Sequence, residues 1–260
     1  TVGVTVSNSV ICNGNSTILS GTGANTYNWT GGVTNAVAFS PTATATYTVI
    51  GTNTVTGCSN TAVASVTVNN CAPGAALNFD GTNDRVNLGS AITSGLSGGN
   101  KVTVEAWVKP TSFSGLGCIV GNYNTGVGAL QILLRRAGNS YYEFWIGNGG
   151  SWFSTNSVAT PSLNTWQHVA GTWDGSVASI YVNGVLSGTT TPALTVLGNA
   201  SNNPVWIGAN TINENFTGDV DEIRIWNRSL CMGEIQNNMN GEIPTTATGL
   251  LANYHFNQGL

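Results

Sequence analysis

Apolar and polar residues alternate along most of the chain, and this two-residue period predicts β-strands. The clearest case is Gln167–Trp173 followed by Ala178–Val182, two alternating runs on either side of Asp174-Gly175. Both turn residues tolerate a positive φ, which suits the tight turn of a hairpin. Alternation gives this hairpin a single buried face, on which Val169 is expected. Such a hairpin is typical of an antiparallel sandwich or barrel.

The same period predicts many further short strands, separated by turns rich in Gly, Asn and Thr. Up to residue 70 they are expected at Val2–Val6, Ser16–Ser20, Tyr27–Trp29, Val37–Ser40, Thr44–Thr52 and Thr61–Val68. Beyond residue 75 they are expected at Ala75–Phe79, Arg85–Leu88, Val102–Lys109, Cys118–Asn122, Leu130–Arg136, Tyr142–Gly147, Ser151–Thr155, Gln167–Trp173, Ala178–Val182, Val205–Ile207, Val220–Trp226 and Leu250–Phe256. One short helix is expected near Cys231–Met239, with Ser229 as its N-cap. The pattern predicts an all-β protein.

Two domains are predicted, residues 1–70 and residues 75–260, separated by the segment Asn69–Gly74. Pro73-Gly74 interrupts any strand there, and no charged side chain occurs before Asp80. The first domain is predicted to be a β-sandwich with Trp29 in its core. The second is predicted to be a sandwich in which the first and last strands pair.

Four segments resemble a known family. The run TWQHVAGTWDGSVASIYVNGVLSG (165–188) is similar to the core hairpin of laminin-G-like, concanavalin-type jelly-roll domains, a group that includes pentraxin relatives. The runs ALNFDGTNDRVNL, TVEAWVKP and GDVDEIRIWNRSL, at 76–88, 103–110 and 218–230, fit the same family. The resemblance implies a jelly-roll sandwich, a fold whose members bind sugars or proteins.

A second resemblance concerns the first domain. The runs VICNGNSTILSGTGANTYNWTGG and FSPTATATYTVIGT are similar to immunoglobulin-like or PKD-like repeats of large secreted proteins of the Bacteroidetes type. In those proteins the module is usually a spacer. The resemblance implies a piece of a larger multidomain chain that is secreted or held at the cell surface, and the start at Thr1 fits a mature or excised piece.

Charge narrows the range of partners. Only 7% of the residues are charged, and the 7 Lys and Arg are scattered along 260 residues. No basic stripe can neutralise phosphates, so the sequence argues against nucleic acid and against a polybasic membrane contact. The apolar runs are too short to insert into a membrane.

The 5 cysteines are an odd number, so at least one is unpaired. A disulfide between Cys12 and Cys58 is expected in an oxidising compartment, and the alternative is that all five are free thiols.

No catalytic constellation is visible. A retaining glycosidase of this fold type carries two carboxylates on one face of a strand. Asp219 and Asp221 share a face, but Ile223 and Ile225 continue that strand as buried positions, and Glu105 stands alone. Neither His168 nor His255 accompanies a nucleophile motif, and His168 is expected to be a hydrogen-bonded strand residue. The sequence therefore predicts that the protein is not an enzyme.

Alternation also selects a candidate carbohydrate site. Leu130, Ile132 and Leu134 are expected to face the core, so that the intervening side chains face outward. If the neighbouring strands pair, one outer surface would carry Tyr123, Gln131, Arg135, Glu143, Trp145 and Trp152. Exposed aromatic rings stack on sugars, and Arg135 with Arg136 would suit an acidic or sulfated sugar. The alternative is that Trp145 belongs to the core, as predicted for Trp107, Trp173, Trp206 and Trp226.

A structural Ca²⁺ ion is the second candidate site. Asp80, Asn83 and Asp84 offer oxygen ligands in one turn, and Asp221 would join them if the end strands pair. The alternative is an ordinary surface turn.

Together these patterns predict a non-catalytic, lectin-like carbohydrate-binding module that recognises a polysaccharide or glycan, including an acidic or sulfated one. The alternative is a structural or protein-interaction module of a surface adhesin.

Overall fold

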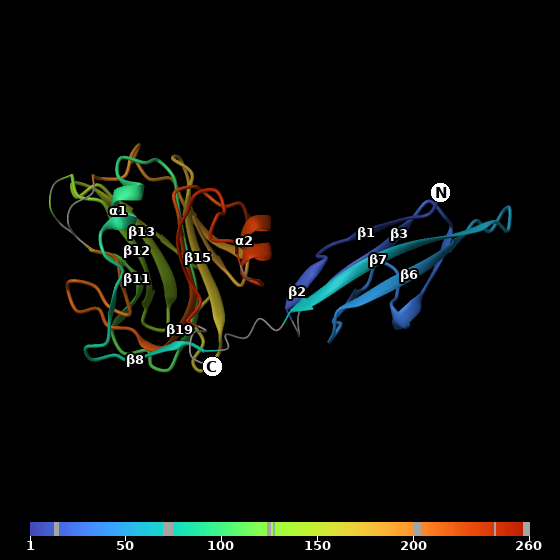
Figure 1. The fold of residues 1–260 in the computed structure, drawn as a ribbon, viewed down its shortest axis with the longest axis horizontal. Helices are drawn as coiled ribbons and strands as arrows, with labels where there is room; N and C mark the ends of the chain where they lie inside the picture. Colours follow the sequence, from blue (N-terminus) through green and yellow to red (C-terminus); the bar gives the residue numbers. More distant parts are fainter. Residues whose placement is uncertain are drawn as a thin grey trace. The chain divides into compact units, whose positions relative to one another are not determined.

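The structure, a computed structural model, describes residues 1–12, 16–69, 75–123, 126, 128–199, 204–241 and 243–256. The chain divides into two compact units, made chiefly of residues 1–71 and 72–260. The predicted boundary at Asn69–Gly74 lies almost entirely outside the described residues. Both units are built from strands, which confirms the all-β class (Figure 1).

The first unit contains two sheets around one core. Its elements are β1 (Gly3–Val6), β2 (Val10–Cys12), β3 (Thr17–Thr22), β4 (Thr26–Trp29), a 3₁₀ turn at Thr30–Gly32, β5 (Ala38–Phe39), β6 (Ala45–Thr52) and β7 (Ser59–Asn69). The sheet orders are β1-β3-β5 and β2-β7-β6-β4. Trp29 is buried in the core as predicted, and its indole N–H donates to Asn35 Oδ1. Strand β2 was not predicted, and the assignment to the immunoglobulin-like or PKD-like class stays a prediction.

The predicted Cys12–Cys58 disulfide is wrong, because Cys58 is a free, exposed thiol. Strand β2 runs parallel to β7 and pairs Cys12 with Asn69, at the far end of β7 from Cys58. A strand of that length separates the two backbone positions by about 30 Å. A disulfide needs Cα atoms within about 7 Å.

The second unit is a sandwich of two antiparallel sheets. Its elements are β8 (Leu77–Asp80), β9 (Val86–Asn87), α1 (Ala91–Leu96), β10 (Val102–Pro110), β11 (Leu116–Asn122), β12 (Gln131–Ala137), β13 (Tyr141–Gly147), β14 (Trp152–Asn156), β15 (Gln167–Trp173), β16 (Ala178–Val182), β17 (Val185–Thr190), β18 (Trp206–Ile207), β19 (Thr217–Trp226), α2 (Met232–Asn238) and β20 (Leu250–Tyr254). We call β17-β16-β15-β10-β19-β20, with β8, the first sheet and β14-β13-β12-β11-β18-β9 the second sheet.

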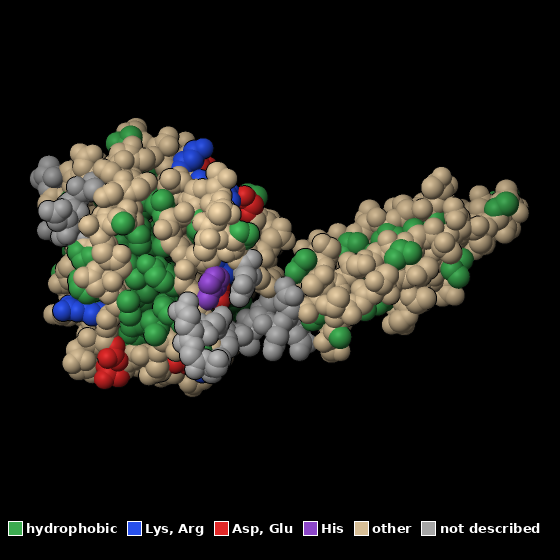
Figure 2. Space-filling view, viewed as in Figure 1, with side chains coloured by type: hydrophobic (Ala, Val, Ile, Leu, Met, Phe, Trp, Pro, Cys, Tyr) green, Lys and Arg blue, Asp and Glu red, His purple; other side chains and the backbone are tan. Residues whose placement is uncertain are grey.

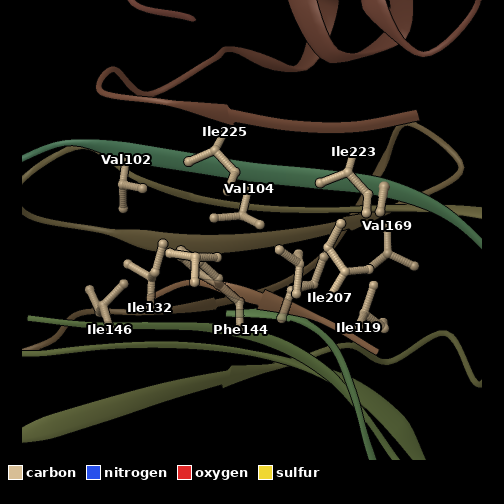
Figure 3. Packing of buried hydrophobic residues seen from close by; sticks show 14 of the residues in the cluster. Val102, Val104, Ile119, Ile132, Phe144, Ile146, Val169, Ile207, Ile223 and Ile225 are labelled. Atoms are coloured by element: carbon tan, nitrogen blue, oxygen red, sulfur yellow. The ribbon is translucent and has the colours of Figure 1, made fainter. Parts of the chain in front are cut away.

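The main core lies between these sheets. Figure 3 shows Val104, Val169 and Ile225 of the first sheet facing Ile132 and Phe144 of the second. The inward positions of β12 and β13 are those that the alternation predicted. Their neighbours in sequence therefore point away from the core, onto the outer face of the second sheet.

The tryptophan predictions are half right. Trp173 lies in the main core, and Trp226 is buried in a smaller cluster with Ile235 of α2. Trp107 and Trp206 are only half-buried and lie on the outer faces, because the aliphatic residues on both sides of each point inward. Placing those two in the core was wrong.

The end strands were predicted to pair with each other, and they do not. Both lie along the same strand, β19: β8 pairs with its Thr217–Val220 part and β20 with its Ile223–Trp226 part. Asp221 and Glu222 fall between these two stretches, and Glu222 has a φ of 51°. The irregular backbone there allows one strand to serve two partners in succession.

Three local features differ from expectation. Helix α1 spans six residues, too few for a helical period to show in the sequence. Strand β17 follows a two-residue turn at Asn183-Gly184, where φ is 51° and 73°, as a type I′ hairpin requires. The predicted helix is present as α2, but its N-cap is Cys231 rather than Ser229, with the Cys231 N–H donating to Glu234 Oε2.

Few charges reach the surface. Figure 2 shows scattered charged side chains on the visible face of the second unit and none on the first. No helix in the described ranges is long and apolar enough to cross a membrane.

Candidate functional site

The structure brings the predicted residues together on the outer face of the second sheet, but Gln131, Arg135 and Glu143 are buried there rather than exposed. Strands β12, β13 and β14 are neighbours, as the prediction required. Their register forms three cross-strand rows. These are Arg135–Glu143–Asn156, Leu133–Trp145–Ser154 and Gln131–Gly147–Trp152.

Arg135 holds the first row together with ion pairs. Its Nε lies 2.5 Å from Glu143 Oε2, and its NH1 group lies 2.6 Å from Glu214 Oε1. The Asn210 side-chain amide donates to the other oxygen of Glu214. Burial alone would lower the pKa of Arg135, but the hydrogen bonds and charges of the two carboxylates outweigh burial and raise it. Arg135 is therefore a fixed, neutralised cation.

Trp145 forms the middle of this face. The Arg135 guanidinium lies over its ring, 4.9 Å from the centroid. This cation–π contact covers one side of the indole and fixes its orientation, while the ring remains half-buried rather than fully enclosed. Trp145 is thus a surface residue of the sheet, and its alternative placement in the core is wrong.

Trp152 is the most exposed aromatic residue of the face, with 48% of its surface accessible. It lies opposite Gly147, and Gln131 lies on the other side of that glycine. A Cβ at position 147 would come within 2.5 Å of Gln131 Oε1 and 3.2 Å of Trp152 Cβ. The glycine therefore lets Gln131 and Trp152 approach each other across β13.

Tyr123 follows the end of β11, beside the Gln131 end of the face, and is half-buried. Its carbonyl oxygen accepts a hydrogen bond from the Thr211 hydroxyl. Together with the Arg135–Glu214 pair, this contact places the segment 210–214 along one border of the face.

Sequence reasoning missed Trp206, Asn210 and Glu214. Trp206 lies on the same outer face, where Gly121 and Asn87 flank it across the strands and Arg85 lies over its ring. In Val205–Ile207 the two aliphatic residues point to the core, so alternation places Trp206 on the outer face, as it did for Trp145. Asn210 and Glu214 lie in an irregular segment whose position no sequence period determines.

Arg136 does not belong to this face. It points into the end of the sandwich with no exposed surface, and it donates to the carbonyl oxygens of Ser114, Gly115 and Gly138. It cannot contact a sugar, so its predicted role was wrong.

The structure separates one of the four predicted calcium ligands, Asp221, from the other three. Asp80 pairs with Thr217, so Asp221 lies four residues further along β19, about 13 Å away. Asp221 is fully buried, and burial raises its pKa to about 7, which disfavours the charged form that calcium prefers. Within the described ranges no group of three or more His, Cys, Asp or Glu is arranged to hold a metal. Asp80 and Asp84 instead accept backbone N–H groups of their own turn.

A second polar cluster occupies the outer face of the first sheet. Glu105 and His168 come from neighbouring strands, and their Oε2 and Nε2 atoms lie 3.6 Å apart. Burial raises the pKa of Glu105 to about 7 and lowers that of His168 to about 3. The predicted hydrogen-bonded role of His168 is wrong for its ring, whose nitrogens make no hydrogen bond with described residues.

Helix α2 closes this cluster off from solvent. The Arg224 guanidinium donates to the Asn238 carbonyl, and the Trp107 indole donates to the Met239 carbonyl, at the C-terminal end of the helix. Glu105 and His168 have no exposed surface beneath it. A carboxylate and an imidazole from separate strands meet here, but a substrate cannot reach them.

The comparisons with known proteins agree with this fold. Residues 80–236 match the concanavalin A-like lectin/glucanases superfamily. No curated protein matches the chain.

Three solved structures are similar. Domain 4 of an extracellular GH43 arabinanase from Geobacillus stearothermophilus, solved with arabinotriose, is 22% identical, with a TM-score of 0.52 over 65% of this chain and 79% of that one. A candidate carbohydrate-binding protein from Bacteroides ovatus is 18% identical, with a TM-score of 0.57 over 96% and 70%. A sialidase module, CBM40 from Ruminococcus gnavus, bound to sialyllactose, is 14% identical, with a TM-score of 0.51 over 66% and 99%. At these identities the likeness establishes the fold.

Proposed function

The chain belongs to the concanavalin A-like lectin/glucanases superfamily, and from this premise we propose that its second unit is a non-catalytic carbohydrate-binding module. Its structural neighbours include sugar-binding modules, one solved with arabinotriose and one with sialyllactose. We also propose a secreted or cell-surface location, where such a module would hold a larger protein on a polysaccharide. The burial of Glu105 and His168 supports the proposal that the module is non-catalytic, because no substrate can reach these groups.

One observation carries the proposal: Trp152 is exposed and lies diagonally next to half-buried Trp145 on the same sheet face. Diagonal cross-strand neighbours lie about 7–8 Å apart, a spacing that lets two rings contact one sugar chain. A large exposed aromatic side chain such as Trp152 costs hydrophobic stabilisation, and a second, half-buried ring beside it extends the aromatic surface, so the pair supports a binding surface. Gln131 lies beside them in the row of Gly147 and Trp152, but its side chain is buried, so the exposed Trp152 ring is the main contact for a sugar.

A neutral polysaccharide fits this face better than the acidic or sulfated one predicted from Arg135 and Arg136. Arg135 is paired with Glu143 and Glu214, so the group as a whole is negative, and Arg136 is buried elsewhere. A sulfate or carboxylate would meet two carboxylates and no unpaired arginine in this group.

The test is affinity electrophoresis of the whole chain in gels that contain neutral polysaccharides (arabinan, xylan, mannan, β-glucan) or sulfated and acidic ones. Trp152→Ala and Trp145→Ala should each weaken retention about fivefold, because a stacking contact is worth about 1 kcal/mol. Trp166→Ala is the matched control, since this half-buried tryptophan lies in a loop outside the face. Retention of both face variants at the wild-type level would contradict the proposed face.

The alternative function, protein interaction, is favoured by a different surface. The edge strand β17 of the first sheet exposes Val185 and Leu186. An exposed apolar edge strand can pair with a strand of another protein. It becomes the better interpretation if the wild-type protein is retained by no polysaccharide.

A structural Ca²⁺ ion at Asp80, Asn83 and Asp84 stays a proposal without Asp221. Its support is that three residues with oxygen-bearing side chains lie within five positions of one surface turn.

A further inference from the structure

A pocket lies at one end of the sandwich, beside the proposed face. Its volume is about 440 Å³, within the range of small-ligand sites. Four segments that are distant in sequence build it: Gly98 after α1, Gly128 before β12, the β13–β14 turn, and residues 196–199.

Backbone hydrogen bonds fix these segments to one another. Gly98 donates to Gly198 O, and Asn199 donates to Gly128 O at 2.7 Å. Gly198 in turn donates to the Gly147 carbonyl, which belongs to the row of Gln131 and Trp152. Because these links are made by the chain itself, the pocket exists before any ligand binds and is joined to the sheet face.

The lining is small, polar and uncharged. Four glycines expose backbone, Asn148, Asn199 and Ser151 contribute polar side chains, and Val196 and Leu197 form an apolar side. The exposed Asn199 carboxamide makes no hydrogen bond with the described part of the chain. Carboxamides and hydroxyls pair with sugar hydroxyl groups, whereas an ionic ligand would find no counter-charge in the lining.

We infer that this pocket is a second sugar subsite, which takes one uncharged sugar residue of the same chain that stacks on Trp152. Ser151 lines the pocket and directly precedes Trp152, and Gly147, which lies opposite Trp152, is bonded to Gly198 of the lining, so the pocket adjoins the ring and a glycan stacked there would extend into it. The inference rests on the proposed function, and it adds that recognition needs at least two adjacent neutral residues.

Two substitutions test the pocket without disturbing the face. Asn199→Ala removes an exposed carboxamide, and Asn28→Ala, an exposed strand asparagine of the first unit, is its matched control. Gly150→Leu adds bulk at the lining. A Cβ at position 150 meets only Asn148 Oδ1, at 3.7 Å, and its φ is not positive, so the fold should tolerate it.

On a neutral polysaccharide that retains the wild-type chain, Asn199→Ala should weaken retention about fivefold, as for one hydrogen bond, and Gly150→Leu at least about tenfold. Melting temperatures should stay at the wild-type value. In addition, a trisaccharide made by partial hydrolysis of that polysaccharide should shift the NMR amide signals of Gly98, Gly128 and Gly198.

The outcomes separate the two ideas. If Trp152→Ala weakens retention while Asn199→Ala and Gly150→Leu behave as wild type, the pocket inference is overturned and the proposed face stands. If no neutral polysaccharide retains the wild-type chain, the proposed function fails and the subsite fails with it.

Discussion

At the scale of single residues, the chain places its ionisable groups where they serve the fold. Glu105 is fully buried and accepts a hydrogen bond from the Trp226 indole at 3.0 Å. Burial raises its pKa to about 7 although Arg224 and Arg228 lower it. Glu105 therefore keeps its proton between about pH 4.5 and pH 7, where an exposed glutamate has lost it.

Glu105→Gln tests this protonation. Between about pH 4.5 and pH 7 folded Glu105 holds a proton that the unfolded chain has released, so rising pH destabilises the wild type. Glutamine removes this effect. The stability of the variant relative to wild type should rise by about 2–3 kcal/mol between pH 4.5 and pH 8, measured by urea unfolding.

Glu234→Gln is the control for that experiment. Glu234 is partly exposed, and hydrogen bonds with the Cys231 N–H and Arg228 lower its pKa. The wild type therefore gains a little stability as pH rises, and the stability of Glu234→Gln relative to wild type should fall slightly. A Glu105→Gln difference that does not change with pH would contradict the buried, protonated carboxyl.

At the scale of elements, the hairpin of β15 and β16 sets how closely the two sheets pack. Gly171 of β15 has the same parity as the core residues Val169 and Trp173. A Cβ at this position would lie 2.2 Å from the Phe144 ring of β13. Because Gly171 has no side chain, the Phe144 ring of the opposite sheet can pack directly against its backbone.

Gly171→Ala should therefore destabilise the second unit by about 1–3 kcal/mol through overpacking. Adding Phe144→Leu should recover part of this loss, so that the double variant costs less than the two single changes together. Thermal and urea unfolding measure both. Gly150→Ala is the control, because a Cβ there meets no atom closer than 3.7 Å, and equal costs at the two glycines would contradict the packing argument.

At the scale of the whole molecule, each unit has a hydrophobic core of its own. Leu19, Val49 and Val66 belong to the first core, and every described residue of that core comes from the first unit. The change of composition near residue 70 predicted two domains. That each unit folds independently of the other stays a proposal.

A fragment of residues 75–260 should fold alone and keep the polysaccharide retention of the whole chain, because the face and the pocket lie within it. A fragment of residues 1–71 should show no retention. Calorimetry and affinity electrophoresis of the two fragments check this, and a 75–260 fragment that melts without cooperativity would rule out independent folding.

The sequence by itself determined the all-β class, most strand positions and the inward or outward direction of each strand residue, because alternation depends only on the local backbone. Alternation was enough to place Gln131, Glu143 and Trp145 on one outer face. The same rule, applied to Val205–Ile207, would have placed Trp206 there as well.

Tertiary structure alone decided what lies next to what. It paired Arg135 with Glu214 from a distant loop, which removed the free cation expected for an acidic sugar. It separated Asp221 from Asp80 through the register of β8 on β19, and it assembled the pocket from four distant segments. These outcomes depend on long-range register and loop closure, for which local periodicity carries no information.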